Sequence, residues 1–196
     1  MKKYIIALAL FLFSSLSFGF SQADLFELLQ KPNNTQGNFT QNRFLKALKN
    51  PIVISGEFSL IKNQGLLWHT QKPFDNYLRV TKSGINQWNG KSWVDNNKLG
   101  ESEQVSLFLG LLSGNTDALD DQFQLSLRGS DAQWQLTLIP ESLLMKQIFT
   151  EIVLNGDEVV KQIELKEKQG DRTLIQFKDI KLNAPVSAFT QNALKP

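Results

Sequence analysis

The sequence predicts a mainly β protein with a few helices, in which one curved antiparallel sheet carries helices over its apolar face. Three observations predict this fold class. Short segments rich in Gly, Asn and Asp recur along the chain, apolar and polar residues alternate between them, and only a few segments have helical periodicity. Such alternation is typical of an antiparallel sheet with one apolar and one polar face, because successive side chains point to opposite sides.

The start of the chain is expected to be a signal peptide. Two lysines precede an apolar run at Tyr4–Phe13, and small residues follow as far as Ala23. The run is about 10 residues long, too short for a transmembrane helix, which needs roughly 20. Residues 1–23 are therefore expected to be removed on export, with cleavage after Gly19 as the alternative. Residues 24–196 are expected to form one domain.

The charge and cysteine content exclude several classes of protein. The chain has 196 residues, with 21 Lys and Arg against 19 Asp and Glu. Lys2 and Lys3 account for this excess and lie in the predicted signal peptide, so the exported chain is neutral. A neutral chain lacks the positive field that binds phosphates, and no nucleic-acid partner is expected. The absence of Cys excludes a thiolate metal site, a cysteine nucleophile and a lipid anchor on an N-terminal Cys.

Strands are expected between the turns. A short helix is expected first, at Asp24–Lys31, before Pro32-Asn33-Asn34. The strands that follow alternate clearly: one face carries Ile52, Ile54, Gly56, Phe58 and Leu60, and others carry Phe123, Leu125 and Leu127, or Trp134, Leu136 and Leu138. The turns expected to supply a residue with positive φ are Asn63-Gln64-Gly65, Ser83-Gly84, Asn89-Gly90, Asn155-Gly156-Asp157 and Gln169-Gly170-Asp171.

Two helices are expected to interrupt the strands. Glu103–Ser113 has apolar residues at helical spacing around a wide arc, Phe108 and Leu112 among them, and Gly114 is placed to end it. Because that arc is too wide for an ordinary surface helix, this segment is expected to cover an apolar surface. A second short helix is expected at Glu141–Lys146, after a proline that suits a first turn.

Catalytic and cofactor motifs are missing. The single His, His69, stands in a strand-like run, and no Gly-x-Ser-x-Gly elbow accompanies it. The acidic pairs Asp120-Asp121 and Asp157-Glu158 lack the ligand spacing of a calcium loop and are interpreted as solvated turn charges. No Gly-rich phosphate loop follows a strand. We therefore expect neither an enzyme nor a bound metal or other cofactor. A binding or carrier role remains.

The surplus of large apolar residues is the most informative feature of the composition. All four Trp and most of the 14 Phe lie after the predicted signal peptide. Ordinary core packing explains many of them. A single curved sheet capped by few helices also closes less tightly than a sandwich and can hold an apolar ligand. The residues alone do not separate a filled core from an open cavity.

The chain resembles the LolA family of periplasmic outer-membrane lipoprotein carriers over nearly the whole exported sequence. The order and spacing of several segments carry the resemblance: Gly37-Asn38-Phe39-Thr40-Gln41, Gly56-Glu57-Phe58, Leu67-Trp68-His69-Thr70, Lys72-Pro73-Phe74, Ser83-Gly84, Trp88 with Gly90-Lys91-Ser92-Trp93, Pro140, Phe149-Thr150-Glu151-Ile152, Gly170-Asp171-Arg172-Thr173, Phe177, Asn183 and Phe189.

The resemblance implies an unclosed antiparallel barrel of about eleven strands, with helices over its concave apolar face. It also implies a soluble monomer in the periplasm whose cavity takes the acyl chains of a lipoprotein or a related lipid. An inner-membrane ABC transporter would load this cargo and an outer-membrane acceptor would receive it. The candidate cavity residues are Phe39, Phe58, Leu60, Trp68, Trp88, Phe108, Leu112 and Leu136.

The resemblance also implies a latch on the helical lid. Family members have an Arg before the Trp-containing strand that holds the lid through helical backbone, and counting back from Trp68 puts Lys62 there. Lys lacks the planar fork of Arg, so Arg43 is the second candidate. The chain ends at Pro196, before the C-terminal loop and strand of the best-known carriers. The alternative function is a periplasmic sensor or scaffold that uses the same fold to bind a protein.

Overall fold

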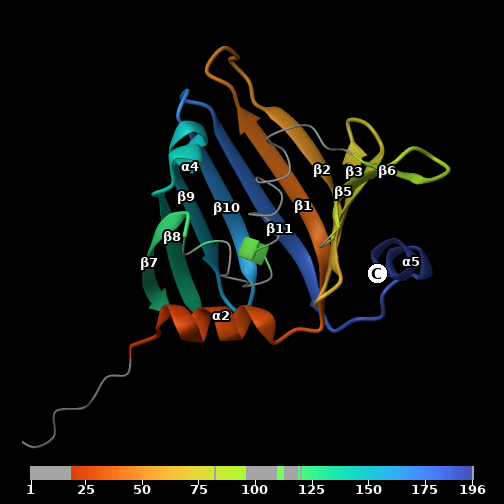
Figure 1. Ribbon diagram of the computed structural model, residues 1–196, viewed down its shortest axis with the longest axis horizontal. Helices are drawn as coiled ribbons and strands as arrows, with labels where there is room; N and C mark the ends of the chain where they lie inside the picture. Colours follow the sequence, from red (N-terminus) through yellow and green to blue (C-terminus); the bar gives the residue numbers. More distant parts are fainter. Residues whose placement is uncertain (1–18, 82, 96–109, 113–118, 120, 196) are drawn as a thin grey trace, which may run out of the picture.

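The computed structural model describes residues 19–81, 83–95, 110–112, 119 and 121–195. Eleven strands form one antiparallel sheet in the order β6-β5-β4-β3-β2-β1-β11-β10-β9-β8-β7 (Figure 1). The strands are β1 (Asn34–Phe44), β2 (Ile52–Ile61), β3 (Gly65–Lys72), β4 (Asn76–Thr81), β5 (Gly84–Trp88), β6 (Trp93–Asp95), β7 (Phe123–Ser130), β8 (Gln133–Pro140), β9 (Phe149–Gly156), β10 (Val160–Glu167) and β11 (Arg172–Leu182).

The sheet curves but does not close. Its outer strands, β6 and β7, each pair on one side only within the described residues. The first and last strands, β1 and β11, pair at the centre of the sheet, with Phe39 opposite Phe177. The predicted fold class, mainly β with an unclosed antiparallel sheet, is confirmed.

Most of the expected turn residues have the backbone that was predicted. Asn63 and Gly65 at the β2–β3 turn have φ of 62° and 143°, and Gly84, Gly90 and Gly170 have φ between 93° and 121°. Gly156 is the exception, because its φ is not positive. A Cβ on Gly156 would lie 2.4 Å from Cζ2 of Trp134 and 2.2 Å from the backbone oxygen of Val159. This glycine therefore allows close packing and does not serve a left-handed turn.

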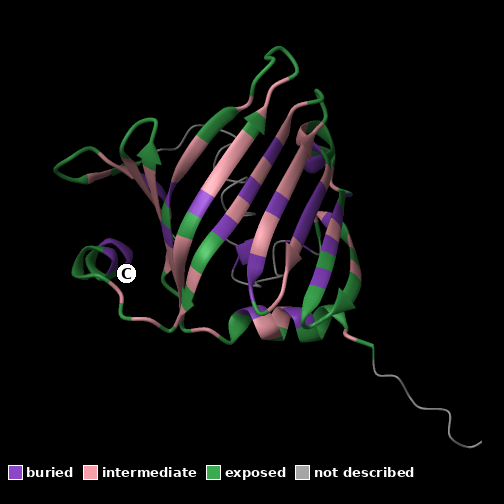
Figure 2. Cartoon of the chain, turned by 180° about the vertical axis from the view of Figure 1, so that it is seen from behind, coloured by how far each residue is buried: buried purple, intermediate pink, exposed green. Residues whose placement is uncertain are grey.

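The concave face of the sheet carries the main core. Inward side chains on most strands are buried, and the purple bands in Figure 2 mark them across the sheet. Phe58 is 4% exposed, Trp134 1% and Leu136 1%, as their alternation predicts. Trp134 also donates from Nε1 to the backbone oxygen of Asp157 at 2.5 Å, which satisfies its one polar group.

Helix α2 (Gln22–Gln30) crosses one end of the concave side (Figure 1). It begins two residues before the predicted start because Ser21 is its N-cap: the Ser21 side chain accepts from the Asp24 amide, and the Asp24 carboxylate accepts from the Ser21 amide. These hydrogen bonds lower the pKa of the Asp24 carboxyl. Leu25 and Leu29 lie on the buried side of the helix, in the main core.

The other described helices are short. Helix α4 (Leu143–Ile148) follows Pro140 with Ser142 as its N-cap, close to the expected Glu141–Lys146. Helix α5 (Ala188–Leu194) was not predicted, and it packs on the convex side against β3 and β4. Of the helix expected at Glu103–Ser113, only residues 110–112 are described; they are helical, and Leu111 and Leu112 are buried in the main core.

Replacement of Gly156 by Ala is expected to destabilise the fold. The added methyl meets the Trp134 ring and a backbone oxygen, and overpacking of this kind costs about 1–3 kcal/mol of unfolding free energy. Glu158→Ala, an exposed change in the same turn, is the control and should stay within about 0.5 kcal/mol. Urea unfolding measures both, and equal midpoints for the two variants would contradict the packing role.

Candidate ligand-binding cavity

A cavity of about 290 Å³ lies on the concave side, at the lower end of the usual range of roughly 300–1,000 Å³ for ligand pockets. Inward side chains from β1, β3, β4, β5, β9, β10 and β11 line it, so strands on both sides of the central β1–β11 pair contribute. The lining residues are Gln41, Arg43, Leu66, Trp68, Leu78, Val80, Ile85, Phe149, Leu165, Glu167, Thr173 and Ile175.

Apolar groups form most of this lining. Leu66, Val80 and Ile85 are each at most 4% exposed, so they are fixed by the core on one side and border the cavity on the other. Trp68 lines the cavity beside them and is only partly buried. A wall of this composition favours hydrocarbon over water, because almost all of its surface is apolar.

Behind Trp68 the concave face is aromatic. Its ring stacks on Phe39, with centroids 3.7 Å apart. Phe177 meets Phe58 edge-on at 4.9 Å and Trp68 at 6.3 Å. We call Phe39, Phe58, Trp68 and Phe177 the inner aromatic cluster. Packing against it fixes Trp68 and gives one cavity wall a rigid, flat surface.

Polar side chains stand where the cavity reaches the end of the sheet. Gln41 and Arg43 are the last inward residues of β1, Glu167 ends β10, and Thr173 lies at the start of β11. Nη2 of Arg43 lies 3.9 Å from Oε1 of Glu167, and the two side chains are 45% and 15% exposed. The cavity therefore has apolar walls and a polar mouth, an arrangement that fits an amphiphile with its tail inside.

Some of the predicted cavity residues lie at the cavity, and others lie elsewhere in the same core. Trp68 lines the cavity, and Phe39 and Phe58 lie behind it in the inner aromatic cluster. Leu60, Leu112 and Leu136 belong to or pack against the same core without lining the cavity. Phe108 lies outside the described residues.

Trp88 departs from the prediction, because it lies on the convex face. On β5, Ile85 points into the cavity, so the side chain of Trp88, three residues further, points the opposite way. It packs there against Trp93, at 5.3 Å between ring centroids, and Phe189 of α5, at 6.1 Å. Trp88 therefore belongs to a separate aromatic cluster behind the sheet.

The two latch candidates lie at opposite ends of the sheet. Nζ of Lys62, in the β2–β3 turn, donates to the backbone oxygen of Gln30 at the end of α2, at 2.8 Å. At the other end of α2, Nε2 of Gln22 donates to the backbone oxygen of Leu125 on β7, at 3.1 Å. Helix α2 is thus tied to both halves of the sheet, whereas Arg43 lies at the cavity mouth with Glu167.

Several lining residues were missed by the sequence-based prediction. Leu78 and Val80 alternate with polar neighbours on β4, and Thr173 and Ile175 alternate with other residues on β11. That alternation was a usable signal. The order of β4 and β11 along the sequence did not indicate that these strands face one another across a cavity.

The one histidine has a structural setting. His69 lies on the convex face, where Nε2 is 2.7 Å from Oδ1 of Asp75 and the ring stacks on Tyr77 at 3.8 Å. Burial raises the pKa of the Tyr77 hydroxyl, and the Asp75 and Glu57 carboxylates raise it further.

In the described ranges no group of three or more His, Cys, Asp or Glu residues could hold a metal ion. No helix there is long and apolar enough to cross a bilayer.

Comparisons with known proteins agree on the fold. A family model described as "Outer membrane lipoprotein carrier protein LolA" matches residues 30–190. A crystal structure of MucB is similar, with a TM-score of 0.53 and 13% identity over 89% of this chain and 62% of that chain. MucB in the complex of MucA and MucB from Pseudomonas aeruginosa has a TM-score of 0.51 and 13% identity over 85% of this chain and 57% of that chain.

These structural likenesses show the fold alone, because the identities are low. The chain also spans less than two thirds of the MucB chains that it matches. A LolA superfamily protein from Nitrosomonas europaea gives a TM-score of 0.49 and 9% identity, over 90% of this chain and 98% of that chain. A comparison with curated protein sequences gave no significant match.

Proposed function

Because the chain belongs to the family of the outer membrane lipoprotein carrier protein LolA, we propose that it is a periplasmic carrier of acylated cargo. It shields the acyl chains of lipoproteins or related lipids and moves them from the inner to the outer membrane. The observation that carries this proposal is the cavity beside Trp68, whose walls are apolar and whose mouth holds Arg43 and Glu167.

The energetics of acyl transfer suit such a cavity. Each buried methylene contributes about 0.8 kcal/mol, so several methylenes in the cavity give a useful affinity while leaving the cargo exchangeable. A larger closed cavity would hold the chains too tightly for transfer. The partners implied by this role are a transporter complex at the inner membrane and an acceptor at the outer membrane. The carrier works as a monomer and needs no cofactor.

The contact between Lys62 and Gln30 supports a role for α2 as the movable part of the carrier. Two side-chain hydrogen bonds to backbone oxygens hold the ends of this helix, one donated by Gln22 and the other by Lys62. A bond of this kind contributes about 1 kcal/mol, so cargo that replaces the core contacts of Leu25 and Leu29 has only these weak bonds left to break. Lys62 supplies one hydrogen bond where the planar fork of Arg could supply several, so this latch is weaker than an arginine latch.

A second candidate function is the binding of a protein partner. The similarity to the MucB structures favours it, because one of them is a complex with MucA. Replacement of the cavity-lining residues Trp68 or Leu78 by polar residues separates the two functions. Partner capture that survives these replacements would favour the scaffold, and its loss together with acyl binding would favour the carrier.

The folded domain includes residues before Ala23, which bears on export. Phe20 packs against the main core and Ser21 caps α2. Cleavage after Ala23 would remove both, whereas cleavage after Gly19 would retain them. We therefore place the processing site between Gly19 and Phe20, with residues 1–19 as the signal peptide.

Leu78→Asp is expected to weaken acyl binding. Leu78 lines the cavity and is partly exposed to it, so a carboxylate there opposes hydrocarbon entry while leaving the buried core intact. Titration of the purified exported protein with a fluorescent fatty acid should show an affinity at least about tenfold weaker, equivalent to about 1.4 kcal/mol. Ile139→Asp adds the same charge at a 40% exposed position on the convex face and should bind as the wild type does. Equal binding by all three proteins would contradict the cavity as the acyl site.

Lys62→Leu is expected to free the C-terminal end of α2 and to change cargo transfer more than folding. Loss of its bond to Gln30 should speed hydrogen exchange in α2 about fivefold, the equivalent of about 1 kcal/mol, with the urea midpoint little changed. Lys31→Leu, an exposed change next to the same helix, is the control. Slower exchange, or a large loss of global stability with normal cargo transfer, would contradict the latch.

The exported protein is expected to begin at Phe20. Intact-mass measurement of protein recovered from the periplasm tests this directly. A chain that begins at Asp24 instead should be less stable, by about 1 kcal/mol for the lost cap and by more for the lost Phe20 contact. An observed N-terminus at Asp24 on a protein with wild-type stability would refute this assignment.

A further inference from the structure

Exposed apolar side chains gather at the end of the sheet where the cavity mouth lies. Leu143 and Leu144 of α4 are 82% and 49% exposed. In the β1–β2 hairpin, Leu48 is 50% exposed, and Ile52 and Val53 at the start of β2 are 42% and 52% exposed. Isolated exposed apolar residues are common, but these come from separate segments and lie at one end of the molecule.

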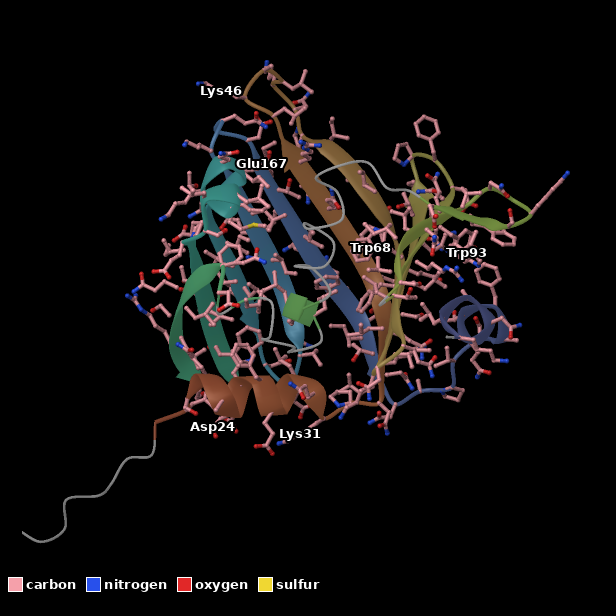
Figure 3. All side chains as sticks on the ribbon, in the orientation of Figure 1. Asp24, Lys31, Lys46, Trp68, Trp93 and Glu167 are labelled. Carbon is pink, nitrogen blue, oxygen red and sulfur yellow. The ribbon has the colours of Figure 1, made fainter. Side chains whose placement is uncertain are left out.

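The antiparallel topology places these segments together. Neighbouring strands alternate in direction, so the β1–β2, β3–β4 and β10–β11 connections and the α4 segment between β8 and β9 all lie at one end. Figure 1 shows the β1–β2 hairpin and α4 at the top, with α2 at the bottom. In Figure 3 the same upper end carries Lys46 and Glu167, the latter at the cavity mouth. We call the side chains of Leu48, Ile52, Val53, Leu143 and Leu144 the apolar rim.

Lysines accompany the apolar rim. Lys46 and Lys49 lie in the β1–β2 hairpin, which has no acidic residue, and Lys146 and Lys168 lie on α4 and in the β10–β11 turn. Most carboxylates at this end are already engaged: Glu167 with Arg43, Asp75 with His69, and Asp171, whose Oδ1 accepts from the Lys46 amide. The exposed side chains of Glu141 and Asp121 also lie at this end, and the four lysines outnumber them.

The opposite end has a different character. Asp131 lies in the β7–β8 turn, Asp157 and Glu158 lie in the β9–β10 turn, and Asp24 and Glu27 are on α2. Lys31, Lys62, Lys161 and Lys181 lie at this end too, and Nζ of Lys161 is 3.3 Å from Oδ1 of Asp157, so the far end carries both charges in similar number. A membrane surface that carries anionic lipids therefore attracts the lysine-rich end at the cavity mouth more strongly than the mixed far end.

We propose that the apolar rim and its lysines dock this protein on an anionic lipid bilayer, with the cavity mouth facing the membrane. Leucines that project from separate loops suit insertion among lipid headgroups and acyl chains, and lysines beside them suit the phosphates above. The charge match between the lysines and anionic headgroups favours a bilayer over a protein partner. The inference deepens the proposed carrier function, because docking in this orientation shortens the path of an acyl chain between bilayer and cavity.

Vesicle sedimentation of the exported protein tests the proposal. At low salt, we expect binding to vesicles of phosphatidylethanolamine and phosphatidylglycerol, with at least tenfold weaker binding to vesicles of phosphatidylcholine alone. The double variant Leu143→Asp/Leu144→Asp should weaken binding to the anionic vesicles at least tenfold. Its side chains are exposed, so its thermal unfolding should match the wild type. Equal binding to both vesicle types, or wild-type binding by this variant, would overturn the proposal.

A matched pair of charge variants separates docking from general electrostatics. Lys46→Glu/Lys49→Glu should weaken binding to the anionic vesicles about tenfold or more. Lys31→Glu/Lys181→Glu makes the same change of net charge at the opposite end and should have a much smaller effect. Equal losses in the two variants would overturn an oriented docking surface. Capture of a membrane protein without any binding to pure lipid vesicles would also overturn it, in favour of a protein interface.

The failure of docking and the failure of the carrier function are distinguishable. Leu78→Asp lies in the cavity and away from the apolar rim, so it should sediment with anionic vesicles as the wild type does. Acyl binding with no vesicle binding by the wild type would overturn the docking proposal and leave the cavity as the acyl site. Vesicle binding with no acyl binding would overturn the carrier function and support the docking surface.

Discussion

The pairing of β1 with β11 is the constraint on which the rest of the structure depends. It joins the first and last strands at the centre of the sheet, so that the strands from β1 to β6 lie on one side of this pair and the strands from β11 to β7 on the other. The two outer strands remain apart, and the concave face cannot be covered by the sheet itself. Helix α2 and the helical residues 110–112 cover parts of that face with Leu25, Leu29, Leu111 and Leu112. Among the described residues this cover is partial, and the cavity lies on the part of the face that they leave open.

The concave face changes character along its length. In its middle the inner aromatic cluster packs as densely as an ordinary core, since Phe39 and Trp68 lie 3.7 Å apart between ring centroids. Towards the mouth, the inward positions of β1, β10 and β11 become polar at Arg43, Glu167 and Thr173. A ligand with a hydrocarbon tail and a polar head gains from this order, because its head stays near water while its tail replaces water against the cavity wall. The same order limits affinity, since only part of a long chain fits.

Much of the fold and less of the site could be predicted from the sequence. Alternation located the strands and the buried faces of Phe58, Trp134 and Leu136, because a half-buried strand repeats every two residues wherever it lies. The same pattern could not tell which face of β5 is concave, and so Trp88 was assigned to the cavity. Gly156 was interpreted as a turn residue, because its close contact with Trp134 comes from another strand. Helix α5 is only seven residues long, too short to show a helical repeat, and its buried Leu194 packs against Leu67 of β3, which is distant in the sequence. Lys62 was identified through the family resemblance, since nothing local to it indicates a partner on α2.

Strand β3 explains how a face that lines a cavity can still be stable. Leu67 points outward between Leu66 and Trp68, which point into the cavity, so the strand packs on its convex side whether or not the cavity is filled. On that side Ala193 and Leu194 of α5 are at most 2% exposed. Nη1 of Arg79 on β4 donates to the backbone oxygen of Ala193 at 3.1 Å, and its guanidinium lies 5.0 Å from the Trp93 ring. Strands β3 and β4 are therefore held from the convex side as well, so their packing does not depend on the cavity side alone. In the proposed carrier function, this second core on the convex face would keep the strands folded while the cavity exchanges its ligand.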